Sequence, residues 1–177
     1  SRTDLDITDG QRLKTLIERH QPWAIINAAG FVNLDAAESF NDICFRENAR
    51  GPVVLAEVCM KYSVAFLTFS SDQVFDGNSV SPYTELSLPA PLNIYGASKL
   101  WAEKHVLEIN PAALVIRTGA FFSPWDRYNF VIKMINAIKH GQEFFAAHDQ
   151  IVSPTYVPDL VNTCLGLLID KERGIWH

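Results

Sequence analysis

Short apolar segments alternate with longer segments of helical periodicity along this chain, and this alternation limits the folds open to it. Apolar segments of strand length occur at residues 23–27, 64–69 and 113–117, with another beginning at 174–177 and a short one at 143–146. Apolar residues at helical spacing occur at residues 9–20, 49–62, 95–107, 129–140 and 157–169. Strands that are buried on both faces and joined by helices form parallel sheets. The sequence therefore predicts an α/β fold with a Rossmann-like doubly wound parallel sheet.

Polar residues follow three of the predicted strands at the point where each strand ends. Asn27-Ala28-Ala29-Gly30 follows the first strand, Ser70-Ser71-Asp72 the second and Arg117-Thr118-Gly119 the third. The carboxyl ends of parallel strands meet at one edge of the sheet, where doubly wound folds bind their ligands. A single cluster of this kind is what an ordinary turn contains. Three clusters at the same edge indicate a binding site.

Tyr95 and Lys99 are four residues apart at the start of a predicted helix, so their side chains lie on one face. A free tyrosine hydroxyl has a pKa of about 10. A neighbouring ammonium favours the phenolate, and we expect Lys99 to bring the pKa of Tyr95 toward neutrality. A phenol with such a pKa is suited to donate a proton to a carbonyl oxygen. A surface Tyr and Lys at this spacing are also common, so the other motifs have to distinguish the two interpretations.

Five motifs occur in an order that resembles one enzyme family. They are NAAG at 27–30, SDQVFDG at 71–77, PLNIYGASK at 91–99, RT at 117–118 and DQIVSPT at 149–155. Together they resemble the dTDP-4-dehydrorhamnose reductases, which are extended short-chain dehydrogenase/reductases, over nearly the whole chain from Asp6 to His177. The resemblance implies that a 4-keto-6-deoxy sugar nucleotide is reduced with NADPH or NADH.

The resemblance also implies roles at the reacting end of the site. Tyr95 resembles the catalytic acid, and Lys99 resembles the residue that lowers its pKa and holds the nicotinamide ribose. Ser71 stands where the family usually has Thr, and its hydroxyl would hydrogen-bond the substrate carbonyl as a preorganised donor. Asp72 falls at a substrate-contacting position, whereas the side chain of Ser70 should point elsewhere.

Cofactor contacts are implied at two further segments. Ala28, Ala29 and Gly30 would lie along the cofactor, where small side chains let the backbone approach closely. Asp6 and Ile7 match the segment that meets the adenine end of the cofactor.

The match is ambiguous or incomplete at four places. Asn48 resembles a helix Asn that helps to order the catalytic lysine, and a packing role for it is equally open. Ala120 stands where the family often has a substrate-facing Trp, Gln73 replaces a usual Tyr, and residues 123–126 interrupt a loop that is normally Gly-rich. The last three departures leave the exact sugar open, though not the reaction type.

The 177 residues contain no Gly-x-Gly-x-x-Gly or Gly-x-x-Gly-x-x-Gly motif. The family has this phosphate-binding loop in a first βαβ unit, and glycine amides at a helix N-terminus supply much of the affinity for a pyrophosphate. We therefore expect a fragment that lacks the first βαβ unit and a C-terminal segment, and that binds NADPH or NADH weakly. In the Rossmann strand order, residues 23–27 would then form an unpaired sheet edge through which the chain self-associates.

Composition argues against several other classes of protein. The 177 residues fit a single domain, residues 1–177, and a net charge of −5 disfavours a nucleic acid as partner. No apolar run approaches the roughly 20 residues of a membrane helix. The five histidines and three cysteines show no metal-ligand spacing, so no metal is expected. Three widely spaced cysteines indicate reduced thiols in a cytoplasmic protein.

Two alternatives to the reductase use the same fold. The regulatory subunit of methionine adenosyltransferase resembles this family in the same motifs, and the retention of Ser71, Tyr95 and Lys99 favours the enzyme over it. An epimerase or dehydratase of the superfamily is the other alternative. Dehydratases usually have an Asp-Glu pair beside the Ser, which Asp72-Gln73 lacks. We therefore expect a sugar-nucleotide reductase.

Overall fold

A computed structural model describes residues 5–126, 129–147 and 151–177 of the chain. The chain divides into two compact units, one of Ser1–Thr118 with Leu167–His177 and the other of Gly119–Gly166. The single domain expected from the sequence stays a prediction, because compactness alone does not show whether a unit folds independently.

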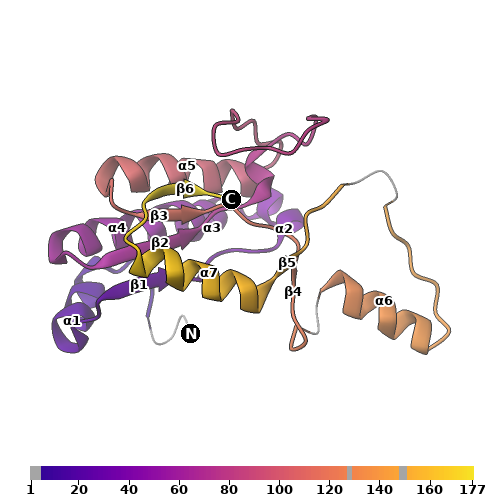
Figure 1. Cartoon of the computed structure of the whole chain (residues 1–177), viewed down its shortest axis with the longest axis horizontal. Coiled ribbons are helices and arrows are strands. Elements are labelled where there is room, and N and C mark those ends of the chain that lie inside the picture. Colours follow the sequence, from indigo (N-terminus) through magenta and orange to yellow (C-terminus); the bar gives the residue numbers. More distant parts are fainter. Residues whose placement is uncertain (1–4, 127–128, 148–150) are drawn as a thin grey trace. The chain divides into compact units, whose positions relative to one another are not determined.

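The first unit is built on a four-stranded parallel sheet (Figure 1). Its strands are β1 (Ala24–Asn27), β2 (Ala65–Phe69), β3 (Leu114–Ile116) and β6 (Gly174–Trp176), in the spatial order β1-β2-β3-β6. Parallel neighbours need a crossover between them, and helices fill the crossovers from β1 to β2 and from β2 to β3. The predicted α/β class, the parallel sheet and its four main strands are confirmed.

Five helices match the predicted segments within a few residues. They are α1 (Gly10–His20), α4 (Gly51–Tyr62), α5 (Ile94–Ile109), α6 (Phe130–Lys139) and α7 (Val157–Ile169). Side chains cap several of them as the sequence suggests. The carboxylate of Asp9 accepts a hydrogen bond from Arg12 N at 2.9 Å, which satisfies one of the unpaired N–H groups at the start of α1. Within the described residues, no helix is long and apolar enough to span a bilayer.

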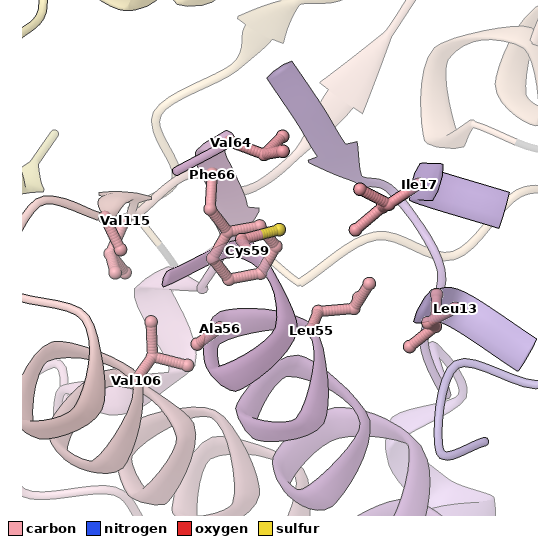
Figure 2. Packing of buried hydrophobic residues seen from close by; sticks show 10 residues of the cluster. Leu13, Ile17, Leu55, Ala56, Cys59, Val64, Phe66, Val106 and Val115 are labelled. Atoms are coloured by element: carbon pink, nitrogen blue, oxygen red, sulfur yellow. The ribbon is translucent and has the colours of Figure 1, made fainter. Parts of the chain in front are cut away.

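The core of the first unit joins α1, α4 and α5 to the central strands (Figure 2). Its buried members are Leu13, Ile17, Leu55, Ala56, Cys59, Val64, Phe66, Val106, Ala113 and Val115. Phe66 on β2 and Val106 on α5 are both at most 1% exposed. Removing such side chains from water is the main stabilising contribution to folding. This packing fixes α5 along the sheet, so the start of α5 comes near the carboxyl ends of the strands.

Four elements of the first unit follow no pattern that the sequence makes visible. They are α2 (Leu34–Ser39), α3 (Asn41–Phe45), a π-helical segment η1 (Arg46–Arg50) that runs directly into α4, and a 3₁₀ turn η2 (Asp72–Val74). Each is too short for helical periodicity to stand out, since periodicity needs a window of at least about 11 residues.

The second unit contains α6 and a pair of two-residue strands, β4 (Phe121–Phe122) and β5 (Thr155–Tyr156), which are parallel. The strand predicted at 143–146 is wrong, because the structure has an irregular segment there. Phe145 is 87% exposed, so the aromatic residues that suggested a strand are not paired into a buried sheet. Asp149 and Gln150 of the DQIVSPT motif lie outside the described residues.

Candidate active site

Ser71 lies at the carboxyl end of the sheet, where β2 gives way to η2. Its hydroxyl accepts a hydrogen bond from Gln73 N at 3.2 Å and donates one to Asp72 Oδ1 at 2.9 Å. Ser71 therefore caps the 3₁₀ turn that follows it. The side chain is buried, whereas Asp72 beside it is exposed.

Tyr95 and Lys99 occupy the first turns of α5. The helix begins where the Asn93 side chain accepts a hydrogen bond from Gly96 N at 2.7 Å. Lys99 Nζ lies 5.7 Å from the centre of the Tyr95 ring and donates a hydrogen bond to Phe69 O, at the end of β2, at 3.1 Å. The spacing of four residues thus places both side chains on one face, as predicted.

Gly96 allows the start of α5 to approach η2 closely. A Cβ at position 96 would lie 2.0 Å from Gln73 O, a distance that no side chain can occupy. This close approach brings the Ser71 hydroxyl within hydrogen-bonding reach of Tyr95. The structure thus brings together Ser71, Tyr95 and Lys99, which the sequence placed on two separate segments.

The acidity of Tyr95 differs from the expectation. Burial raises the pKa of Tyr95 above its ordinary value, the hydrogen bond with Ser71 lowers it, and the nearby Asp72 and Cys44 raise it further. Burial also lowers the pKa of Lys99 to about 8. The prediction that Lys99 brings the pKa of Tyr95 toward neutrality is therefore wrong for the protein alone. Loss of hydration is the largest influence on the phenol, and Tyr95 holds its proton at neutral pH.

Asn48 links the segment after β1 to the start of α5. Its side chain accepts a hydrogen bond from Phe31 N at 2.8 Å and donates one to Phe31 O at 3.0 Å. The same amide donates to Ser98 Oγ at 3.3 Å, and Ser98 donates to Tyr95 O at 2.6 Å. Asn48 is fully buried in η1, a kind of helical bulge that is frequent at functional sites.

The residues expected along the cofactor lie beside Lys99. Ala28 and Ala29 are exposed directly after β1, and the Asn27 side chain accepts a hydrogen bond from Ala29 N at 3.1 Å. A Cβ on Gly30 would lie 2.7 Å from Asn48 Oδ1 and 3.6 Å from Lys99 Nζ. Ala28 and Ala29 therefore leave exposed backbone after β1, which fits a dinucleotide lying along the sheet edge, and the missing side chain of Gly30 leaves room for Asn48 beside Lys99.

Asp6 and Ile7 are engaged by the protein itself. The Asp6 carboxylate accepts hydrogen bonds from Thr8 and forms an ion pair with Arg46. Backbone and side-chain bonds from Thr8 hold the pKa of Asp6 below its usual value, with a smaller contribution from Arg46. Ile7 packs against Gly51, where an added Cβ would meet its side chain at 2.4 Å. Contact of either residue with a cofactor stays a prediction.

Glu103, in the middle of α5, is a member of this region that no sequence motif singled out. It is 2% exposed and pairs with Arg117, which the sequence placed in a ligand-facing cluster. A charged residue within a buried helix face is the signal that could have identified it, because buried charges need partners. A separate hollow of about 350 Å³ contains none of the three site residues. It is lined by Asn41, Asp42, Phe45, Ala49, Arg50, Ile94 and Trp101.

The family model described as RmlD substrate binding domain matches residues 1–177. The chain is 32% identical over 177 residues to a dTDP-4-keto-6-deoxy-D-glucose reductase from Streptomyces niveus, covering all of this chain and 62% of the relative. It is 36% identical over 174 residues to a dTDP-4-dehydrorhamnose reductase from Mycobacterium tuberculosis, covering 96% of this chain and 56% of the relative.

Solved structures agree with these relatives. A dTDP-4-dehydrorhamnose reductase from Bacillus anthracis, in complex with NADP, superposes with a TM-score of 0.92 at 34% identity over 98% of this chain and 61% of that one. A dTDP-4-dehydrorhamnose reductase from Clostridium acetobutylicum also has a TM-score of 0.92, at 32% identity over 99% of this chain and 62% of that one. The chain thus spans about three-fifths of the length of the relatives it matches.

Proposed function

Because the chain belongs to the RmlD substrate binding domain family, we propose that it is part of a reductase that acts on a 4-keto-6-deoxy sugar nucleotide with NADPH or NADH. The observation that carries this proposal is the convergence of Ser71, Tyr95 and Lys99 from two segments at the carboxyl edge of one parallel sheet. A hydroxyl donor, a protonated phenol and an ammonium can assist the transfer of a hydride to a ketone, because they stabilise charge on its oxygen and supply the proton of the alcohol.

Tyr95 acts as the acid in this proposal. Its raised pKa keeps the phenol protonated at neutral pH, so the proton is available when negative charge develops on the ketone oxygen. The Ser71 hydroxyl, which already contacts Tyr95, turns to donate a hydrogen bond to the same oxygen. Lys99, anchored on Phe69 O, stabilises the phenolate that remains after the proton leaves Tyr95.

The open backbone of Ala28, Ala29 and Gly30 would hold the cofactor, with Lys99 beside its ribose. When bound, a reduced nicotinamide supplies the hydride that the ketone carbon needs. The relative from Bacillus anthracis was solved with NADP, which supports a nicotinamide dinucleotide as the cofactor. Asp6 and Ile7 would lie at the adenine end.

Asp72 is the proposed contact to the sugar nucleotide. It is exposed, and it follows Ser71 directly, so its carboxylate can accept hydrogen bonds from sugar hydroxyls beside the reacting ketone. The side-chain oxygen of Gln73 is less available to sugar hydroxyls, because it already accepts a hydrogen bond from Asn93 at 3.0 Å. The relatives' names support a dTDP-linked sugar as the first substrate to test.

A cytoplasmic location is part of the same proposal. Cys44, Cys59 and Cys164 are free and buried, and reduced thiols persist in a reducing compartment. Burial raises the pKa of Cys59 to about 12, which keeps this thiol unreactive.

Oxidation of NADPH and NADH by the complete natural protein, with a dTDP-4-keto-6-deoxy sugar as substrate, tests the proposal. We expect turnover with at least one of the two cofactors, and a severe loss in Ser71→Ala. Ser87→Ala, which removes a hydroxyl from a loop, is the matched control and should keep full turnover. Cofactor binding without any turnover would instead favour the regulatory alternative.

A further inference from the structure

A buried ion pair lies between the two segments that carry the proposed active site. Arg117, at the end of β3, donates from Nε to Glu103 Oε1 at 2.8 Å and from Nη2 to Glu103 Oε2 at 2.7 Å. Glu103 is 2% exposed and Arg117 is 6% exposed. Two parallel bonds between planar groups fix orientation as well as distance. The pair therefore joins the middle of α5 to the end of β3 in one geometry.

The segment that contains Ser71 is tied to this pair on one side and to the backbone next to Arg117 on both sides. Ser70 donates its hydroxyl hydrogen bond to Glu103 Oε1, and Ser70 N donates to Ile116 O at 2.7 Å. On the other side, Asp72 N donates to Thr118 O at 3.2 Å. Ser70 is thus bonded to Glu103 and to Ile116, the residue before Arg117. Asp72 is bonded to Thr118, the residue after Arg117.

The helix that carries Tyr95 and Lys99 is held by the same pair. Glu103 follows Lys99 by one helical turn, so it lies on the same face of α5. The guanidinium of Arg117 also lies 5.0 Å from the centre of the Phe75 ring, directly after η2. One ion pair therefore contacts α5, the end of β2 and the residue that ends η2.

We propose that Glu103 and Arg117 are positioning residues that hold the Ser71 hydroxyl at a fixed distance from Tyr95 and Lys99. The inference rests on the proposed function, since it assigns these two residues to the geometry of that site. Neither residue touches the reacting atoms. Reactions of positioned groups are sensitive to displacements of about 1 Å, so a loosened pair should slow the chemical step more than it weakens binding.

A purely structural role makes a different prediction. Removing one partner of a buried pair leaves an uncompensated charge and destabilises the fold, whereas apolar replacement of both partners is often neutral. A double apolar variant therefore separates the two roles. It restores stability, but it cannot restore the directed bonds to Ser70.

The test compares Glu103→Met, Arg117→Met and the double variant in the complete natural protein. We expect each single variant to melt well below the double variant. In the double variant, kcat should fall at least about tenfold, while KM for sugar nucleotide and cofactor stays within about threefold. Val106→Ala, in the core on α5, is the control for lost stability and should keep its kcat. Recovery of kcat together with melting temperature in the double variant would overturn the proposal.

Ser70→Ala covers the case in which the double variant does not fold. It removes the hydrogen bond from Ser70 to Glu103 and leaves the ion pair in place. We therefore expect kcat to fall, with the melting temperature and KM unchanged. Amide hydrogen exchange at residues 70–74 is measured in parallel and should accelerate, with exchange in β2 unchanged. Unaltered exchange and kcat in Ser70→Ala would refute positioning. If the unmodified protein reduces no sugar nucleotide, the proposed function fails. Amide hydrogen exchange in Ser70→Ala then decides by itself whether the ion pair holds residues 70–74 in place.

Discussion

A phenol that is buried beside a carboxylate keeps its proton, and Tyr95 is in this position. Its hydroxyl bonds to Ser71, and Asp72 lies close enough to raise its pKa further. Lys99 nearby has lost enough hydration for its own pKa to fall to about 8. Burial therefore shifts the pKa of each group toward its neutral form, although Lys99, with a pKa of about 8, still carries its proton at neutral pH.

Tyr95→Phe should remove most turnover without unfolding the protein. The variant loses the proposed acid but keeps the ring, so turnover of the complete natural protein should fall about 10²- to 10⁴-fold. Tyr62→Phe is the matched control, because it removes a tyrosine hydroxyl that donates to Glu18. Turnover of Tyr95→Phe within about threefold of the unmodified enzyme, a barrier change below about 1 kcal/mol, would exclude Tyr95 as the acid.

Lys99→Met should alter both catalysis and the pH dependence of stability. Turnover should fall and the cofactor dissociation constant should rise, because Lys99 is proposed to serve both. The folded-state pKa of about 8 lies below the ordinary lysine value of 10.5, so the unfolded chain binds more protons between these values. The free energy of unfolding of the unmodified protein should therefore rise with pH across this window, by up to about 3 kcal/mol from this residue.

Urea unfolding at several pH values between about 7 and 10.5 measures that contribution as the difference between the unmodified protein and Lys99→Met. The difference cancels the titration of cysteines and tyrosines common to both proteins. A constant difference across the window would show that Lys99 titrates normally in the fold. An unchanged cofactor affinity would leave Lys99 only its electrostatic role.

The contact between the first turn of α5 and η2 depends on a glycine, Gly96, which has no side chain. Gly96 faces Gln73 O so closely that a methyl group cannot be accommodated without moving the helix or the turn. Asn93 fixes the start of the helix at the same point, through its bond to Gly96 N. The approach of Ser71 to Tyr95 follows from this contact.

Gly96→Ala should therefore destabilise the protein, although alanine favours helices. We expect a loss of at least about 2 kcal/mol in the free energy of unfolding, the usual range for overpacking. Gly166→Ala is the matched control in α7, because nothing lies within 4 Å of the added methyl group. That control should gain up to about 1 kcal/mol from helix propensity. Equal stability of the two variants in thermal or urea unfolding would contradict the close approach.

Long periodic segments of the sequence predicted their structure well. Residues 157–169 form α7 as predicted, and α5 extends the predicted helix by one residue at the start and two at the end. The parallel strands were identified because they are buried on both faces and therefore appear in the sequence as continuous apolar runs. The rule that parallel strands end at one edge predicted a shared edge for the polar clusters after the strands, and the family resemblance joined Ser71 to Tyr95 and Lys99.

Features that depend on tertiary contacts were not predictable from one sequence. Asn48, in the π-helical turn of η1, is fixed on Phe31 and Ser98, which lie far away along the chain. The sequence also did not show which residue pairs with the buried Glu103, because Arg117 comes from another element. Burial likewise set the pKa of Tyr95, and spacing alone does not report burial.

At the scale of the molecule, the sheet of the first unit has an edge at β1. Within the described residues, β1 pairs with β2 on one side, and Trp23 and Ile26 along it are 61% and 42% exposed. Backbone groups along such an edge can pair with a strand of another molecule. Self-association of the 177-residue chain through β1 stays a prediction.

Ile26→Lys should weaken that self-association, because a charge on an edge strand opposes pairing with a second copy. Sedimentation of the 177-residue chain over a range of concentrations should show a larger monomer fraction for the variant. Val80→Lys adds the same charge at a fully exposed apolar loop position and should leave association unchanged. Monomeric behaviour of the unmodified chain at all concentrations would rule out the edge as an interface.

The 177-residue chain should also bind NADPH and NADH weakly. It contains open backbone at Ala28–Gly30 and the Lys99 ammonium but no glycine-rich phosphate loop. We expect dissociation constants above about 100 µM by isothermal titration. A value in the low micromolar range would reveal a phosphate site formed by other residues.

The position of β6 in the sheet has a consequence for the order in which the protein is made. β3 lies between β2 and β6, and its partner β6 starts only at Gly174. Residues 117–173 must therefore leave the ribosome before β3 can acquire its second neighbour. Until then, the carbonyl of Trp176 is not there to accept from Arg117 N, and a nascent chain exposes an incomplete sheet. Pairing between such distant segments slows folding, so this intermediate is the stage at which a chaperone would protect the chain from aggregation.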